Sequence, residues 1–162
     1  MAFYKRLGSM AAVLMLLAIP ASASMVSFQL VETGLNGSAS SGQYSRLWES
    51  GLMAAFFDAG YIVTSSPITR MENTPAPGSF IVESLNEAAE GGASYFILGF
   101  IEYNTQRGRA LPVGIVLKVY DSNSRQLIYQ QNFPAGSGRD NNEEMQLAQN
   151  AGRLIISHMK DR

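Results

Sequence analysis

The sequence has 162 residues, with 12 basic and 13 acidic side chains and no cysteine. The missing cysteines exclude a disulfide framework, and the lack of a basic excess argues against a nucleic-acid partner, because nothing is present to neutralise phosphates. An apolar fraction of 46% is sufficient to build a hydrophobic core.

The first 23 residues have the layout of a secretory signal peptide. Lys5 and Arg6 form a basic start, and the uninterrupted apolar run Met10–Ile19 follows them. The small residues of Ala21–Ala23 suit cleavage by a signal peptidase. The apolar run is shorter than the ~20 residues that a membrane-spanning helix needs.

We therefore predict a cleaved signal peptide over residues 1–23 and a single domain over residues 24–162. Loss of Lys5 and Arg6 leaves ten basic against 13 acidic residues, a formal charge of −3. We expect no stable membrane anchor after cleavage, because no cysteine is available for lipid attachment. Export without disulfides favours the periplasm of a bacterial envelope.

The first half of the predicted domain contains a strand, a helix and a second strand. Met25–Glu32 alternates apolar and polar residues, which predicts a strand. Thr33–Gly42 is mostly Gly, Ser, Ala and Asn, which predicts a mobile loop. In Gly42–Ala59, apolar side chains recur every three or four residues, which predicts a helix with Trp48 on its core-facing stripe. Tyr61–Thr64 predicts a short strand.

The second half begins with a long irregular connection, Ser65–Gly78, which contains three prolines and where we expect a partner contact. Ser79–Glu90 predicts a second helix, and Asn142–Lys160 predicts the last one, with Asn141 or Asp140 as its cap. Asn141 and Glu144 have the spacing of a capping box. Three strands lie between these helices: Tyr95–Asn104, Leu111–Asp121 and Leu127–Phe133.

The strand Tyr95–Asn104 is apolar on both faces, so we place it in the centre of the sheet with cover on both sides. Two short polar turns, Thr105–Ala110 and Ser122–Gln126, join it to the strands that follow. The order β-α-β-α-β-β-β-α predicts an α/β (α+β) fold, with a single mixed sheet of about five strands and three helices packed on it.

Candidate metal and nucleotide sites are weak. Glu83, Glu87 and Glu90 share one face of the second predicted helix, but no histidine or aspartate joins them, so we interpret them as a solvated face. The only histidine, His158, has no carboxylate or thiol partners in the pattern of a metal site. The glycines at 34, 37 and 42 match neither nucleotide-binding fingerprint. We predict no metal and no cofactor.

Catalytic constellations are equally weak. A Ser–His–Asp set would depend on His158 near the end of a terminal helix, and no Gly-x-Ser-x-Gly elbow is present. The remaining enzymatic hypothesis is a hydrolase that uses Glu102 and Asp121, which lie on neighbouring predicted strands. We predict that the protein is not an enzyme and assign no catalytic residues.

Three stretches carry a resemblance to a known group of families. Leu52–Val63 runs from a helix through Gly60 into a strand, Gly92–Ile101 leads into the central strand, and Val116–Asp121 ends the next one. They resemble the small α/β module of the TolB amino-terminal domain, the CsgG curli-secretion lipoprotein and lipoprotein activators of penicillin-binding proteins. The families usually have Gly-Ala-Asp where this chain has Gly92, Ala93 and Ser94, so Ser94 departs from the pattern. They also have a Thr-Gly turn where this chain has Ser122–Ser124.

The resemblance implies a fold like that of an anticodon-binding domain and a role in binding other envelope proteins. It covers about Met25–Phe133 and transfers no contact residue. Our leading interpretation is a non-catalytic periplasmic module for protein–protein interaction, with envelope or outer-membrane-associated proteins as partners. The alternative is a small-molecule-binding protein with a pocket beneath the loops Thr33–Gly42 and Ser65–Gly78.

Overall fold

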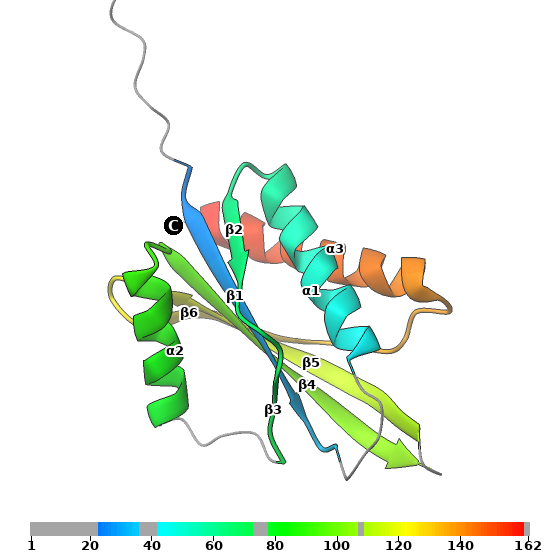
Figure 1. The fold of residues 1–162 in the computed structure, drawn as a ribbon. Helices are drawn as coiled ribbons and strands as arrows, with labels where there is room; N and C mark the ends of the chain where they lie inside the picture. The colour runs from blue at the N-terminus through cyan, green and yellow to red at the C-terminus, as the bar shows by residue number, and fades with distance from the viewer. Residues whose placement is uncertain (1–22, 36–41, 73–77, 107–108, 161–162) are drawn as a thin grey trace, which may run out of the picture.

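The computed structural model describes residues 23–35, 42–72, 78–106 and 109–160. The predicted signal peptide therefore lies outside the described residues, apart from Ala23. The described part forms one mixed sheet and three helices (Figure 1). The elements in chain order are β1 (Met25–Thr33), α1 (Gln43–Asp58), β2 (Ile62–Ser65), β3 (Thr69–Arg70), α2 (Ser79–Glu90), β4 (Tyr95–Gln106), β5 (Arg109–Asp121), β6 (Gln126–Phe133) and α3 (Asn141–Lys160).

The strand order in the sheet is β2-β1-β4-β5-β6, and β3 continues the outer edge beside β1. β1 runs parallel to β2, β3 and β4, whereas β4, β5 and β6 are successive antiparallel neighbours. The predicted mixed sheet with three helices is thus confirmed. None of the described helices combines the length and the apolar character that crossing a bilayer requires.

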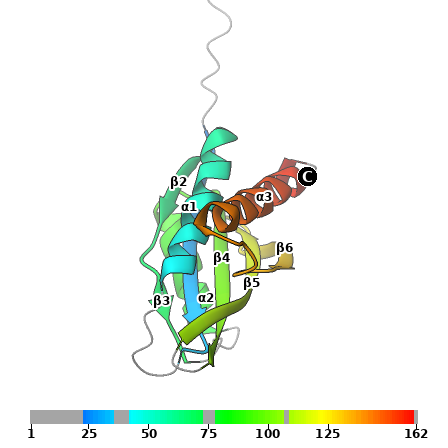
Figure 2. The same ribbon diagram turned by 90° about the vertical axis from the view of Figure 1, so that its right-hand side faces the viewer.

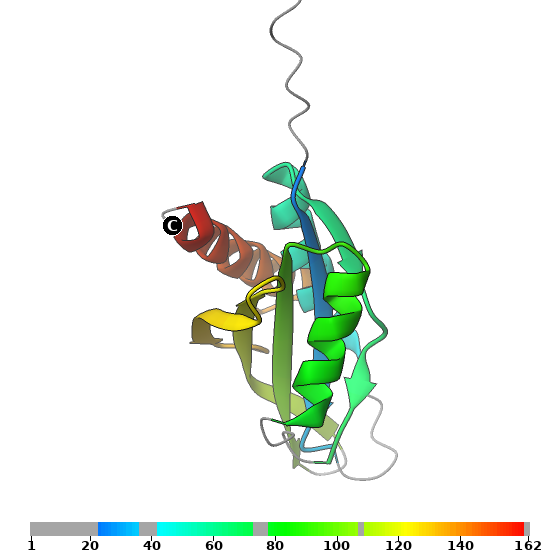
Figure 3. The ribbon, with the colours of Figure 1, turned by 90° about the vertical axis from the view of Figure 1, so that its left-hand side faces the viewer.

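The sheet has helices on both faces. α1 and α3 cover one face and α2 covers part of the other, as the two side views show (Figures 2 and 3). β4 lies between β1 and β5, and its side chains alternate between the two cores: Ile97 and Ile101 face α1 and α3, whereas Phe96 and Leu98 face α2. This central position confirms the prediction from a strand that is apolar on both faces.

α1 and α3 cross at two glycines. A β-carbon added to Gly51 would lie 2.6 Å from the β-carbon of Ala148 and 2.7 Å from the carbonyl oxygen of Met145. A β-carbon on Gly152 would lie 2.7 Å from that of Ala55. The two helices therefore approach so closely that only hydrogen atoms fit at the crossing.

The edge beside β1 differs from the prediction, because β3 was expected to be irregular connection. Thr69 and Arg70 pair with Val31 and Glu32, and Ser66 still donates a backbone hydrogen bond to Phe28 (2.9 Å). Pro67 and Ile68 leave the edge between β2 and β3. Pro67 has no N–H to donate, which favours such a break on an edge strand.

The β4–β5 hairpin is also longer than the sequence predicted, since Thr105 and Gln106 pair with Ala110 and Arg109. The β5 strand contains a bulge, because Glu102 pairs with Gly114 and Tyr103 with Pro112, which leaves Val113 without a partner residue on β4. The hairpin extends past the ends of the helices (Figure 1).

At the start of α3, Asp140 is the cap, which is one of the two residues predicted for that role. The Oδ1 atom of Asp140 accepts hydrogen bonds from the backbone N–H groups of Asn142 and Glu143, both at 2.9 Å. The predicted capping box of Asn141 and Glu144 is wrong, because Glu144 is drawn into the core by Trp48 (Nε1 to Oε1, 2.6 Å).

Candidate functional site

The two carboxylates of the hydrolase hypothesis lie far apart along the β4–β5 ladder. Glu102 pairs with Gly114, whereas Asp121 pairs with Tyr95, seven positions away along β4. At ~3.3 Å per residue this separates them by about 23 Å, which is too far for a shared acid–base site. The structure therefore does not bring the two residues together.

Asp121 serves the turn between β5 and β6. Its Oδ1 atom accepts hydrogen bonds from the backbone N–H of Ser124 (2.7 Å) and from the Ser124 hydroxyl (3.0 Å). The backbone hydrogen bond from Ser124 is the main reason that the pKa of Asp121 is lowered. This side chain stabilises a turn and lines neither of the two cavities at the edges of the sheet.

The other candidates from the sequence are also dispersed. Glu83, Glu87 and Glu90 are exposed on α2. The His158 ring packs on that of Tyr129, with 4.8 Å between their centroids. Among the described residues, no group of three His, Cys, Asp or Glu side chains is placed to hold a metal ion. Of the glycines compared with nucleotide fingerprints, the one at 37 lies outside the described residues.

Trp48 is a core residue, as its spacing predicted. It is fully buried, and its Nε1 atom donates to Glu144, which is 1% exposed. Glu144 also accepts backbone hydrogen bonds from Gly136 (2.6 Å) and Gly138 (2.9 Å). This buried carboxylate thus fixes the turn between β6 and α3 to the side of α1.

β6 forms the outer edge of the sheet opposite β2 and β3, and within the described residues it pairs with β5 alone. Its sequence QLIYQQNF contains no charged residue and no proline. Natural edge strands are usually protected by charges, prolines, bulges or cover. β6 has a single irregularity, at Ile128, between the pairs Val119–Tyr129 and Tyr120–Leu127. Sequence reasoning found the strand but not its edge position.

Next to β6, the face of the sheet that carries α2 is incompletely covered. A hollow of about 550 Å³ is lined by side chains of β4, β5 and β6, among them Phe100, Glu102, Lys118, Gln130 and Asn132. The ammonium group of Lys118 lies 5.4 Å from the centroid of the Phe100 ring. The bulged Val113 also lines this hollow and is 58% exposed.

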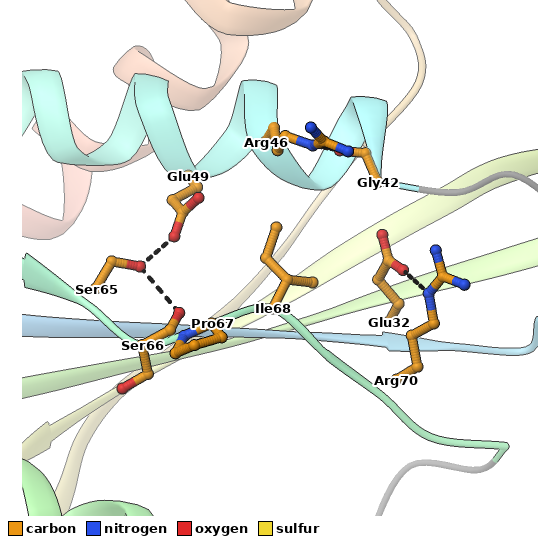
Figure 4. Close-up of a pocket in the computed structure, with 9 residues that line it drawn as sticks. All are labelled: Glu32, Gly42, Arg46, Glu49, Ser65, Ser66, Pro67, Ile68 and Arg70. Carbon is orange, nitrogen blue, oxygen red and sulfur yellow. Dashed lines mark hydrogen bonds and ion pairs between the residues drawn. The ribbon is translucent and has the colours of Figure 1, made fainter.

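A second, more polar cavity of about 530 Å³ lies at the opposite edge, where Pro67 and Ile68 leave β1 (Figure 4). α1 contributes Arg46 and Glu49, β1 contributes Glu32, and β3 contributes Arg70. The described ends of the two loops for which a pocket was predicted also line it, at Gly42 and at Ser65–Ile68. Residues 36–41 and 73–77 of those loops lie outside the described residues.

Below this cavity, Glu32 is 1% exposed and anchors a network of hydrogen bonds. Its Oε1 atom accepts from the Ser45 hydroxyl (2.5 Å), and its Oε2 atom accepts from Arg70 Nε (3.0 Å). Ser45 Oγ also lies 3.0 Å from the Tyr103 hydroxyl. Sequence reasoning missed this network, because Glu32 is one of several polar residues in its strand and its partners lie on other elements.

Burial raises the pKa of Tyr103 to about 12, and the nearby Glu32 carboxylate acts in the same direction. Unfolded chains lose this proton near pH 10, so the native state binds more protons than the unfolded state between pH 10 and about 12. We therefore expect the free energy of unfolding to fall across that window, by at most about 1.4 kcal/mol per pH unit. Urea unfolding of wild type and Tyr103→Phe should show the smaller loss in the variant. Equal losses would contradict the assignment.

The chain belongs to the protein family described as "Uncharacterised protein", whose family model matches residues 25–129. No curated protein sequence matches the chain. Similar solved structures include a PelC dodecamer from Paraburkholderia phytofirmans, with 14% identity over 86% of this chain and 89% of that chain and a TM-score of 0.48.

TolB from Acinetobacter baumannii is similar at 16% identity over 85% of this chain and 28% of that chain, with a TM-score of 0.38. Lipoprotein GNA1162 from Neisseria meningitidis is similar at 12% identity over 86% of this chain and 99% of that chain, with a TM-score of 0.41. TolB and a lipoprotein, both types expected from the sequence, are thus among the similar structures. At these identities and TM-scores the likeness concerns the arrangement of helices and strands and gives no evidence on function.

Proposed function

We propose that the protein is a non-catalytic accessory module of the bacterial envelope, acting in the periplasm, that binds another envelope protein. The observation that carries the proposal is the outer strand β6, which has eight residues, no charge and no proline. Its outward backbone N–H and C=O groups can pair with an extended segment of a partner, which adds one strand to the sheet.

The two faces beside β6 define the chemistry of that segment. On the α2 face, Gln130 and Asn132 are exposed beside the hollow, so side chains of the partner on this face should be polar. On the other face, Tyr129 and Phe133 pack at the margin of the core under α3. Partner side chains there should be apolar or aromatic, which gives the segment an alternating pattern.

Two further observations support a binding role in the periplasm. The signal-peptide layout of residues 1–23 favours export. The carboxylates Glu102 and Asp121 are too far apart to act together. The exposed edge of β6 is suited to binding a partner protein, because main-chain pairing at a sheet edge supplies affinity and the neighbouring side chains supply specificity.

A photo-crosslinking amino acid at Gln131 tests this proposal in intact cells. Gln131 is exposed in the middle of β6, and Glu87 on the outer face of α2 is an exposed control position. We expect a discrete adduct with one envelope protein from Gln131 and none from Glu87. The purified complex should also show slowed amide hydrogen exchange along β6, because the edge N–H groups become hydrogen-bonded.

A second variant separates strand addition from general stickiness. Asn132→Lys, at an exposed position opposite Val116, places a charge on the edge that should weaken pairing while changing the free energy of unfolding by about 0.5 kcal/mol or less. The adduct should decrease strongly in this background. The same adducts from both positions, or an adduct of two copies of this chain, would contradict binding of a separate partner at β6.

A further inference from the structure

The polar cavity at the other edge of the sheet has a charge arrangement that the strand-addition proposal does not use. Its lining contains two guanidinium groups and two carboxylates, together with two serines. Figure 4 shows Arg70 with Glu32 toward one end, and Glu49 with Ser65 and Ser66 at the other. Polar groups gathered in one cavity are available to orient a small ligand.

Within the part of the chain that the structure describes, each guanidinium group has donors to spare. Among the described residues, the hydrogen bonds of Arg46 and Arg70 use the Nε atoms alone, to the carbonyl oxygen of Gly42 (3.2 Å) and to Glu32 Oε2 (3.0 Å). A guanidinium has five N–H donors in a planar fork suited to a carboxylate. The terminal nitrogens of both side chains are therefore available to bind an acidic group of a ligand.

The charges in the cavity differ in how they are balanced. Arg70 forms an ion pair with Glu32, whereas no carboxylate of the described residues forms an ion pair with Arg46. Glu49 accepts a hydrogen bond from the Ser65 hydroxyl and forms no ion pair within the same residues. Within the described part of the chain, one positive and one negative group on α1 thus lack a partner of opposite charge.

We propose that this cavity binds a zwitterionic ligand of the amino-acid or short-peptide class. The ligand carboxylate lies against Arg46 and Arg70, and the ligand ammonium group lies against Glu49. A ligand with negative charge alone would meet two carboxylates in the same cavity, and a cation alone would meet two guanidinium groups. A molecule with one charge of each sign satisfies both ends.

The cavity arises from the break in the edge strand. The backbone N–H of Ser66 still donates to the Phe28 carbonyl of β1 (2.9 Å), but Pro67 and Ile68 do not pair with β1, and the cavity lies between them and α1. The size of the cavity, about 530 Å³, falls within the range of sites for small molecules. Ile68 and Pro67 supply the apolar part of its lining.

The proposal is tested by titrating the mature chain with glycine, diglycine and triglycine while its amide NMR shifts are measured. These probes have no side chains of their own. We expect saturable shifts at Gly42, Ser65 and Ser66 for at least one of the three probes at millimolar concentration. The same probe with an acetylated amino end, or with an amidated carboxyl end, should bind about tenfold more weakly, because each lacks one of the two charges.

Two variants test which end of the cavity binds the carboxylate of the ligand and which end binds its ammonium group. Arg46→Gln should weaken binding of the zwitterion about tenfold and leave the weak binding of the amidated probe, which has no carboxylate, unchanged. Glu49→Gln should also weaken binding of the zwitterion about tenfold, and it should leave the weak binding of the acetylated probe, which has no ammonium group, unchanged. Glu83→Gln, an exposed change on α2, is the control and should bind like wild type. Thermal unfolding checks that all variants are folded. No saturable shift with any probe, or equal binding of free and blocked probes, would overturn the proposal.

Discussion

Replacement of Trp48 by alanine is expected to lower the free energy of unfolding by about 3–5 kcal/mol. The indole is fully buried between α1, the end of β6 and α3, and its ring centroid lies 6.3 Å from that of Phe133. Alanine would leave a cavity and also remove the donor to Glu144. Urea unfolding, followed by circular dichroism because the only tryptophan is lost, measures the change.

Trp48→Phe separates the two contributions, because phenylalanine keeps most of the ring volume but has no N–H group. We expect a loss of about 1–3 kcal/mol from the hydrogen bond to the buried carboxylate. Glu144 would still accept from Gly136 and Gly138. A Trp48→Ala variant with wild-type stability and impaired partner binding would show instead that the indole serves recognition.

Gly51→Leu is expected to lower the free energy of unfolding by about 3 kcal/mol, which is the upper end of the usual range for overpacked cores. The β-carbon alone would lie 2.6 Å from that of Ala148 and 2.7 Å from the oxygen of Met145, so α1 and α3 would have to separate. The gain in helix propensity over glycine, up to about 1 kcal/mol, is too small to compensate.

Ser50→Leu is the matched control, because Ser50 is the exposed neighbour of Gly51 on the same turn of α1. It introduces the same side chain without the contact, so its stability should be within about 0.5 kcal/mol of wild type. Equal stability of the two leucine variants, measured by thermal and urea unfolding, would mean that α1 and α3 do not approach as closely as described.

Local patterns were sufficient to predict most of the elements. The strand Tyr95–Asn104 was placed centrally because a strand apolar on both faces needs cover on both. The neighbouring strand Met25–Glu32 was predicted from its alternation. Gly60, through which the chain was predicted to pass from helix to strand, has a φ of 89°, the left-handed conformation common at helix ends. These features depend on side chains within one segment, which a sequence displays directly.

The errors arise where distant segments decide the structure. β3 has two residues and exists because β1 provides hydrogen-bonding partners for Thr69 and Arg70. The spacing of Asn141 and Glu144 fits a capping box, but Trp48, 96 positions before Glu144, supplies a stronger buried donor. Local spacing gives no information about either partner.

In the candidate site, too, local features were predictable from the sequence and contacts between distant segments were not. The sequence located the two loops beside the polar cavity, since their composition is unlike that of helices or strands. It did not single out Glu32, Arg46 or Arg70, because each is an ordinary charged residue until the parallel pairing of β1 with β3 brings them to one cavity. The edge position of β6 likewise depends on the order of all the strands.

The parallel pairing of β1 on both sides has a consequence for the order of assembly. Val26 is opposite Val63 and Tyr95, which follow it by 37 and 69 positions, whereas β4, β5 and β6 meet through short turns. Closing such long loops costs entropy before any contact is gained, so the hairpins can assemble first and β1 must be inserted afterwards. The amino-terminal strand, first to emerge during synthesis, is thus among the last to acquire its neighbours.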